Sequence, residues 1–151
     1  MKILLLGLGL QGKAVIHDLE HSPLVKEIIA VDLNTEGAQK YIQEKNYSKT
    51  RIVRLNASDK NALHQLIQKS EVEIVVCMLP TDLVYSVVQV AINCNKPFVS
   101  SNYTGRIEEL NRLAEEKGVT VLPEMGLDPG IDLILGRLAI ADFEEVHGLY
   151  S

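Results

Sequence analysis

Six short apolar runs alternate with longer stretches of mixed polarity, and this alternation constrains the fold more than any other feature of the sequence. The runs are rich in Val, Ile and Leu and lack polar alternation, which is typical of strands buried on both faces of a parallel sheet. Parallel neighbours need a crossover connection, and the usual crossover is a helix. We therefore expect strands at Lys2–Leu6, Glu27–Asp32, Arg51–Leu55, Ile74–Leu79, Pro97–Ser100 and Thr120–Leu122.

Each interval between two runs contains a candidate helix. Leu63, Leu66 and Ile67 follow the three–four spacing that places one apolar stripe on a helix. Gly118 is placed to end the last helix as its C-terminal cap. Strand and helix thus alternate in the order of a doubly wound α/β sheet with right-handed crossovers. The expected helices are Gln11–Glu20, Thr35–Lys45, Asp59–Lys69, Asp82–Asn93 and Ile107–Lys117.

The end of the chain departs from this alternation. A turn cluster at Gly126–Gly130 precedes an apolar helix at Ile131–Ala141, and residues 144–151 then resemble the start of a strand. A strand needs a neighbour for its backbone groups, so this one is either a short edge strand of the same sheet or the link to further chain. We expect one domain at residues 1–143, with residues 144–151 leading to a substrate or dimerisation domain of α/β type that this chain lacks.

A glycine pattern lies between the first expected strand and the first expected helix. Residues 7–12 read G-x-G-x-x-G. In this context Gly7 permits the tight turn, Gly9 lets the backbone approach a pyrophosphate, and Gly12 allows the helix to pack closely on the strand. The first helical N–H groups, at Leu10 and Gln11, are free to bind an anion. The pattern predicts a dinucleotide-binding Rossmann domain with strand order 3-2-1-4-5-6.

Asp32 ends the second expected strand, twenty residues after Gly12. At that distance an acidic side chain can accept hydrogen bonds from the ribose hydroxyls of adenosine. Its charge repels a 2′-phosphate, and Leu33 and Asn34 supply no compensating Arg, so we expect NAD rather than NADP. The alternative is that Asp32 only caps a helix or sets a turn.

The turns after the later strands are the other candidates for cofactor contact, because ligands of such sheets lie at the carboxyl ends of the strands. The turn after the third strand should border adenine, and the turn after the fourth should border the middle of the dinucleotide. The turns after the fifth and sixth should approach nicotinamide. Each residue has a plain alternative as a cap or loop residue. The candidates are Leu33, Asn56, Ala57, Met78, Leu79, Pro80, Ser101 and Met125.

Composition argues against several classes of partner. Fifteen Lys and Arg against twenty Asp and Glu give a net charge of −5 without a basic stripe, which disfavours nucleic-acid binding. No apolar run approaches the ~20 residues of a membrane span. Cys77 and Cys94 lie in apolar segments, and no ligand cluster predicts a metal site. Without a secretory signal we expect buried, reduced thiols and a cytoplasmic protein.

Several motifs together resemble the N-terminal domain of the saccharopine dehydrogenase-like family. They are the glycine loop at residues 7–12, Asn56–Asp59, and Met78–Pro80 followed by a helix. Glu124–Asp132, which reads EMGLDPGID, is similar to the most distinctive segment of that family and is far more specific than the glycine loop. The resemblance covers essentially the whole chain. It is strongest to lysine 6-dehydrogenases, with saccharopine reductases next.

The resemblance implies an NAD(P)-dependent oxidoreductase that acts on the C–N bond of an amino acid such as lysine or saccharopine, through an imine. It also implies a second α/β domain that closes over the substrate and often supplies a dimer contact. We therefore expect an amino-acid substrate, no nucleic-acid or membrane partner, and a homodimer in the full-length form. The isolated chain should bind NAD but turn over poorly.

Hydride transfer also needs a group that handles the proton of the amine. Tyr103, Glu124 and Asp128 are the ionisable residues nearest the expected nicotinamide position, and they are our catalytic candidates. In the alternative, Tyr103 packs over the sheet edge and Asp128 sets a turn before Pro129.

A second class of function also fits the glycine loop and the acidic residue. Non-catalytic NAD-sensing domains, of the kind that gate cation transport, have the same layout and respond to occupancy. The turn at residues 126–130 and the apolar helix after it favour the enzyme, because a sensor needs no segment leading into a substrate domain.

Exposed apolar surface on the helix at Ile131–Ala141 should promote dimerisation or aggregation of the chain.

Overall fold

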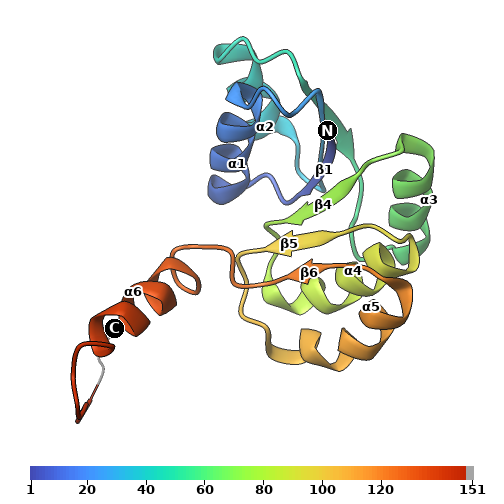
Figure 1. The fold of residues 1–151 in the computed structure, drawn as a ribbon. Coiled ribbons are helices and arrows are strands. Elements are labelled where there is room, and N and C mark those ends of the chain that lie inside the picture. Colours follow the sequence, from blue (N-terminus) through green and yellow to red (C-terminus); the bar gives the residue numbers. More distant parts are fainter. Residues whose placement is uncertain (149–151) are drawn as a thin grey trace.

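A six-stranded parallel sheet with the order β3-β2-β1-β4-β5-β6 organises the chain (Figure 1). This computed structural model describes residues 1–148. Both the fold class and the strand order predicted from the sequence are confirmed. The strands are β1 (Lys2–Leu6), β2 (Glu27–Asp32), β3 (Thr50–Arg54), β4 (Ile74–Cys77), β5 (Phe98–Ser100) and β6 (Val121–Leu122).

Helices cover both faces of the sheet. On one face α1 (Leu10–His21) and α2 (Glu36–Glu44) pack against β1 and β2, through a core that includes Ile3, Leu5, Ile16 and Ile28. On the other face lie α3 (Lys60–Ser70), α4 (Thr81–Asn93), a 3₁₀ helix η1 (Gly105–Leu110) and α5 (Asn111–Lys117). Because β1 is covered on both faces, it reads as a continuous apolar run. None of the helices within residues 1–148 is both long and apolar enough to cross a membrane.

The expected helix at residues 107–117 is two elements in the structure. Residues 105–110 form η1, in which Ile107 and Leu110 are both buried. Residues three apart lie on the same side of a 3₁₀ helix, so this geometry buries both side chains together. The expected C-terminal cap is confirmed, since Gly118 has a left-handed φ of 63° and its N–H donates to the carbonyls of Ala114 and Glu115.

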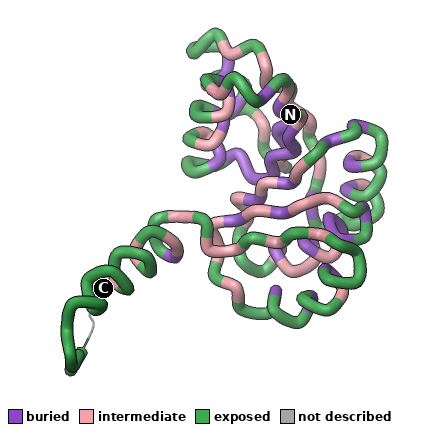
Figure 2. Tube along the Cα trace, viewed as in Figure 1, coloured by how far each residue is buried: buried purple, intermediate pink, exposed green. Residues whose placement is uncertain are grey.

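The last helix, α6 (Ile131–Ile140), projects away from the sheet (Figure 1). None of its residues is buried, and Figure 2 shows it almost wholly exposed. The expected exposed apolar surface is present: Leu133, Ile134 and Leu138 are 53%, 62% and 63% exposed. Residues 144–148 form a bend and irregular backbone in place of the expected strand, because no strand of the sheet lies beside them to pair with. The rest of that expected strand, residues 149–151, lies outside the described residues.

The glycine loop connects β1 to α1 with two close backbone approaches. A Cβ at Gly12 would lie 2.0 Å from the carbonyl oxygen of Gly7, and a Cβ at Gly7, whose φ is 90°, would lie 2.6 Å from the carbonyl oxygen of Met78. Gly9 differs, because no atom lies within 4 Å of the position of a Cβ there. The loop is therefore tight at Gly7 and Gly12 and open at Gly9.

We expect Gly12→Ala to lower the free energy of unfolding by about 1–3 kcal/mol, because the added methyl group must displace backbone. Gly9→Ala should change it by less than about 1 kcal/mol, since the methyl group enters open space and the φ of −66° suits alanine. Urea unfolding followed by circular dichroism measures both variants. An equal decrease in the free energy of unfolding of the two variants would show that the loop is not tight at Gly12 and open at Gly9.

Candidate functional site

A cavity of about 440 Å³ lies at the carboxyl ends of β1, β2, β3 and β4. This is the edge at which doubly wound sheets bind their ligands. Val31, Leu55 and Leu83 contribute apolar walls. Nine residues expected to contact the cofactor also line the cavity: Gly7, Gly9, Asp32, Leu33, Asn56, Ala57, Met78, Leu79 and Pro80.

The N-terminus of α1 opens beside this cavity. Gly9 is its N-cap, and the first helical hydrogen bond runs from the Lys13 N–H to the Gly9 carbonyl at 3.0 Å. No side chain caps the helix, so the N–H groups of Leu10, Gln11 and Gly12 have no partner within it. Leu10 is 89% exposed and Gln11 is also exposed, whereas Gly12 is buried. Together with the space over Gly9, these donors form a cradle that suits a pyrophosphate.

Asp32 stabilises the loops on both sides of the cavity. Its Oδ2 accepts a hydrogen bond from the Leu8 N–H at 2.7 Å, and its Oδ1 accepts one from the Asn34 N–H at 2.9 Å. The turn-forming role considered for Asp32 is therefore real. Each carboxylate oxygen has a second lone pair, so these bonds leave acceptor capacity for a ribose hydroxyl.

Arg54 is a residue that the sequence analysis missed. It ends β3 and is paired in register with Asp32 on β2. With Leu33, Asn34, Thr35 and Glu36 it lines a separate pocket of about 300 Å³ directly beyond Asp32. Neither residue that directly follows Asp32 is a cation, and Arg54 comes from the neighbouring strand. The register of a parallel sheet was the signal that could have found it.

The turn after β3 is held by its own side chains. The Asn56 Oδ1 accepts hydrogen bonds from the Ser58 N–H at 3.0 Å and the Ser58 hydroxyl at 2.8 Å. Asp59 caps α3 by accepting from the N–H groups of Asn61 and Ala62. The Asn56 carbonyl group is thus used locally, and its amide N–H groups remain as donors toward the cavity that Asn56 lines.

Ser101 and Met125 do not line the cavity, but they connect to it. The Met125 N–H donates to the Ser100 carbonyl at 2.9 Å, which joins the turns after β6 and β5. The Ser101 hydroxyl lies 3.6 Å from the sulfur of Met78, a cavity residue. The turns after β4, β5 and β6 are therefore contiguous.

The three ionisable candidates separate into two groups. The Tyr103 hydroxyl donates to the Asp128 Oδ1 at 2.6 Å, and this bond raises the pKa of Tyr103 above its ordinary value. The Glu124 Oε1 instead accepts from the Thr104 N–H at 2.9 Å and the Thr104 hydroxyl at 2.7 Å. These two donors lower the pKa of Glu124. The structure thus pairs Tyr103 with Asp128, while Glu124 binds the adjacent backbone.

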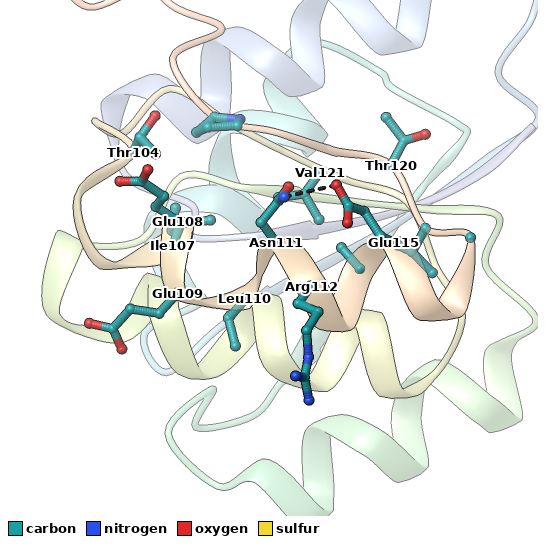
Figure 3. Close-up of a pocket in the computed structure, with 14 residues that line it drawn as sticks. Thr104, Ile107, Glu108, Glu109, Leu110, Asn111, Arg112, Glu115, Thr120 and Val121 are labelled. Atoms are coloured by element: carbon teal, nitrogen blue, oxygen red, sulfur yellow. Dashed lines mark hydrogen bonds between the residues drawn. The ribbon is translucent and has the colours of Figure 1, made fainter.

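A larger cavity, of about 740 Å³, lies elsewhere on the domain (Figure 3). Its walls come from η1, α5 and the segment around β6, and a hydrogen bond of 2.9 Å runs along α5 from the Asn111 side chain to that of Glu115. Its acidic side chains include Glu108, Glu109 and Glu115. No expected cofactor residue lines it. Arg112 also lines it, so three carboxylates face one guanidinium and the net charge is negative. Because negative charge repels phosphate groups, the smaller crevice suits a dinucleotide better.

The cysteines and acidic residues form no metal centre within residues 1–148, where no three His, Cys, Asp or Glu side chains are placed to hold an ion. Cys77 and Cys94 are buried and unpaired, as expected. Burial raises the pKa of Cys77 to about 11 and also raises the pKa of Cys94. Both thiols are therefore neutral at physiological pH and serve to fill the core.

Comparison with known proteins identifies relatives. The family model of the saccharopine dehydrogenase NADP binding domain matches residues 3–122. Saccharopine dehydrogenase (NADP(+), L-glutamate-forming) of Pyricularia oryzae is 30% identical over 146 residues, which are 96% of this chain and 30% of that protein. Alpha-aminoadipic semialdehyde synthase of Arabidopsis thaliana is 31% identical over 116 residues, 76% of this chain and 10% of that protein. Apo saccharopine dehydrogenase (L-Glu forming) of Saccharomyces cerevisiae superposes with a TM-score of 0.79 and 26% identity, covering 92% of this chain and 30% of that one.

The chain spans only 10% and 30% of the length of these two curated relatives. Their family supports a nicotinamide dinucleotide as cofactor and favours NADP over the NAD that the sequence analysis expects. The relatives are oxidoreductases of amino-acid metabolism. Since the family model covers most of the chain, this protein belongs to the saccharopine dehydrogenase family as a domain of its NADP-binding type.

Proposed function

We propose that this chain is the cofactor-binding domain of an NADP-dependent oxidoreductase that acts on the C–N bond of an amino acid such as lysine or saccharopine. The observation that carries this proposal is the crevice at the strand ends, where the uncapped N-terminus of α1 adjoins the open space over Gly9. The family match and the relatives named for amino-acid substrates support the reaction class.

In this proposal the pyrophosphate lies on the glycine loop and the adenine lies near Asn56 and Ala57. The nicotinamide then extends past Met78 toward Ser101 and Met125. This direction follows from the strand order, because β1 lies between the adenine side at β2 and β3 and the nicotinamide side at β4 and β5.

Arg54 is the basis for proposing NADP rather than NAD. A 2′-phosphate on the adenine ribose would extend beyond Asp32, into the pocket that Arg54 shares with Asn34 and Thr35. Arg binds phosphate through charge-assisted hydrogen bonds. Glu36 also lines this pocket and opposes the phosphate, so the selectivity depends on Arg54 being present.

The chemistry requires a hydride and a proton. When bound, NADP supplies or accepts the hydride at the carbon of the C–N bond. The substrate nitrogen must gain or lose a proton in the same reaction, and we assign its handling to Tyr103 and Asp128. The Tyr103 phenol is protonated at neutral pH and would turn its one proton from Asp128 to the nitrogen of an imine in the reductive direction. In the oxidative direction Asp128 would accept the proton that the amine loses.

The proposed pair is open to water, since Tyr103 is 60% exposed. Efficient hydride transfer requires a site from which water is excluded. We therefore propose that a second, substrate-binding domain covers this face in the full-length enzyme. We also propose that the full-length enzyme is a homodimer, because the apolar side chains of α6 offer surface for a contact.

Gly9→Val should weaken NADP binding at least roughly tenfold, a loss of about 1.4 kcal/mol, because the side chain fills the space over the loop. Isothermal titration calorimetry with NADP measures the dissociation constant of both proteins. The unfolding curve of the variant serves as its control for stability. Wild-type protein that fails to bind NADP, or a variant that binds equally well, would refute the proposed function.

Arg54→Ala should reduce the affinity for NADP by about tenfold or more and leave the affinity for NAD nearly unchanged, because only NADP carries the phosphate that Arg54 would bind. Titrations with both dinucleotides measure this selectivity. Arg51→Ala is the matched control, since Arg51 lies at the opposite end of β3 and pairs with Glu27 at 3.6 Å. An equal loss of affinity for NAD and NADP would show that Arg54 does not bind the 2′-phosphate.

The isolated chain should reduce NADP very slowly in the presence of lysine or saccharopine, because Tyr103 is exposed to water. The increase in the absorbance of NADPH measures the rate of this reaction. Steady, substrate-dependent NADPH formation by the 151-residue chain would contradict the need for a covering domain.

A further inference from the structure

Glu124 joins the loop after β6 to the loop after β5 through both its main chain and its side chain. Its N–H donates to the Asn102 carbonyl at 3.0 Å. Its Oε1 accepts from the Thr104 N–H at 2.9 Å and from the Thr104 hydroxyl at 2.7 Å. These bonds lie on the two sides of Tyr103. Because Tyr103 is 60% exposed, its position depends largely on the backbone of these two neighbours.

The backbone of Glu124 adopts the left-handed conformation, with φ of 62°. This conformation is unfavourable for a residue with a side chain and persists only where the surroundings impose it. Here it accompanies an N–H and a carboxylate that both bind the 102–104 loop. The donors at Thr104 also lower the pKa of Glu124, so the carboxylate remains ionised and can accept both bonds at neutral pH.

Asp128 is held from the other side. Asp132 accepts a hydrogen bond from the Gly130 N–H at 2.7 Å and so stabilises the turn that contains Asp128. Three carboxylates raise the pKa of the Tyr103 phenol, those of Asp128, Asp132 and Glu124. The Tyr103–Asp128 pair is therefore assembled from two loops, and Glu124 bonds to both neighbours of Tyr103.

We propose that Glu124 is a positioning residue that holds the phenol of Tyr103 against the carboxylate of Asp128. It acts through Asn102 and Thr104, and its own carboxylate binds Thr104 rather than the pair. The inference rests on the proposed function, in which this pair handles the proton of the substrate nitrogen.

The test compares how Tyr103 responds to Asp128→Asn in different backgrounds. With ¹³C at Cζ of tyrosine, NMR follows the titration of Tyr103, whose signal is identified by its loss in Tyr103→Phe. Asp128→Asn should lower the pKa of Tyr103 in the wild-type background, because the accepting carboxylate is removed. In the Glu124→Ala background the same substitution should give a clearly smaller downward shift. In the Glu124→Gln background, where an amide oxygen can still accept from Thr104, the shift should be nearly full.

This comparison separates the positioning of Tyr103 by Glu124 from the effect of the Glu124 charge. That charge acts on the pKa of Tyr103 both with and without Asp128→Asn, so it cancels in the shift that Asp128→Asn causes. Glu109→Gln is the matched control, because Glu109 is an exposed carboxylate that pairs with Arg106 instead of the loop. A full shift in the Glu124→Ala background, or an equal reduction in the Glu109→Gln background, would overturn the proposal.

Thr104→Val provides a second route if Glu124→Ala does not fold. It removes the hydroxyl donor of Glu124 and keeps the N–H donor, so the shift caused by Asp128→Asn should be partly reduced. A full shift would again overturn the proposal. No dinucleotide or substrate is needed for these titrations. Failure of NADP binding would therefore refute the proposed function and leave the positioning measurement intact.

Discussion

Backbone hydrogen bonds around the end of β1 hold the candidate site in place. The Gly7 N–H donates to the Val31 carbonyl at 2.9 Å, and the Met78 N–H donates to the Leu6 carbonyl at 2.7 Å. The Leu8 N–H donates to Asp32 at 2.7 Å. The glycine loop is thereby tied to β2 on one side and to the turn after β4 on the other. Because β1 is the middle of this arrangement, the crevice, the helix N-terminus and the cofactor turns all depend on its pairing.

The sequence was sufficient for features that repeat along the chain. Apolar runs predicted every strand to within two residues at each end, apart from the segment after residue 143. Their order and the glycine pattern predicted the sheet and its functional edge. That last segment differed because a segment becomes a strand only where a partner strand is available for its backbone groups. The split between η1 and α5 also needed tertiary packing, since it depends on burying Ile107 with Leu110.

Site residues were harder to predict where residues from different strands or loops meet only in the folded chain. Arg54 is remote from the turn after Asp32 along the chain, and only the register of β2 with β3 brings them together. Glu124 was noted for its charge, but its bonds to Thr104 follow from a left-handed backbone that a sequence pattern does not show. The family resemblance, in contrast, was visible from the motifs, and the glycine loop, Asn56–Asp59 and Met78–Pro80 all lie within residues 3–122, which the family model matches.

The joint between β6 and α6 is built from main-chain atoms. A Cβ at Gly130 would lie 2.1 Å from the Gly126 carbonyl oxygen, so the two backbones touch. The Gly126 N–H donates to the Pro129 carbonyl, and the Ile131 N–H donates to the Gly126 carbonyl at 3.0 Å. Only one side chain of the helix, that of Asp132, bonds to this joint, where it accepts from the Gly130 N–H. The direction of α6 therefore depends mainly on main-chain contacts. Substitution of the exposed apolar residues Leu133, Ile134 and Leu138 would therefore change the surface that α6 presents and leave the direction of the helix unchanged.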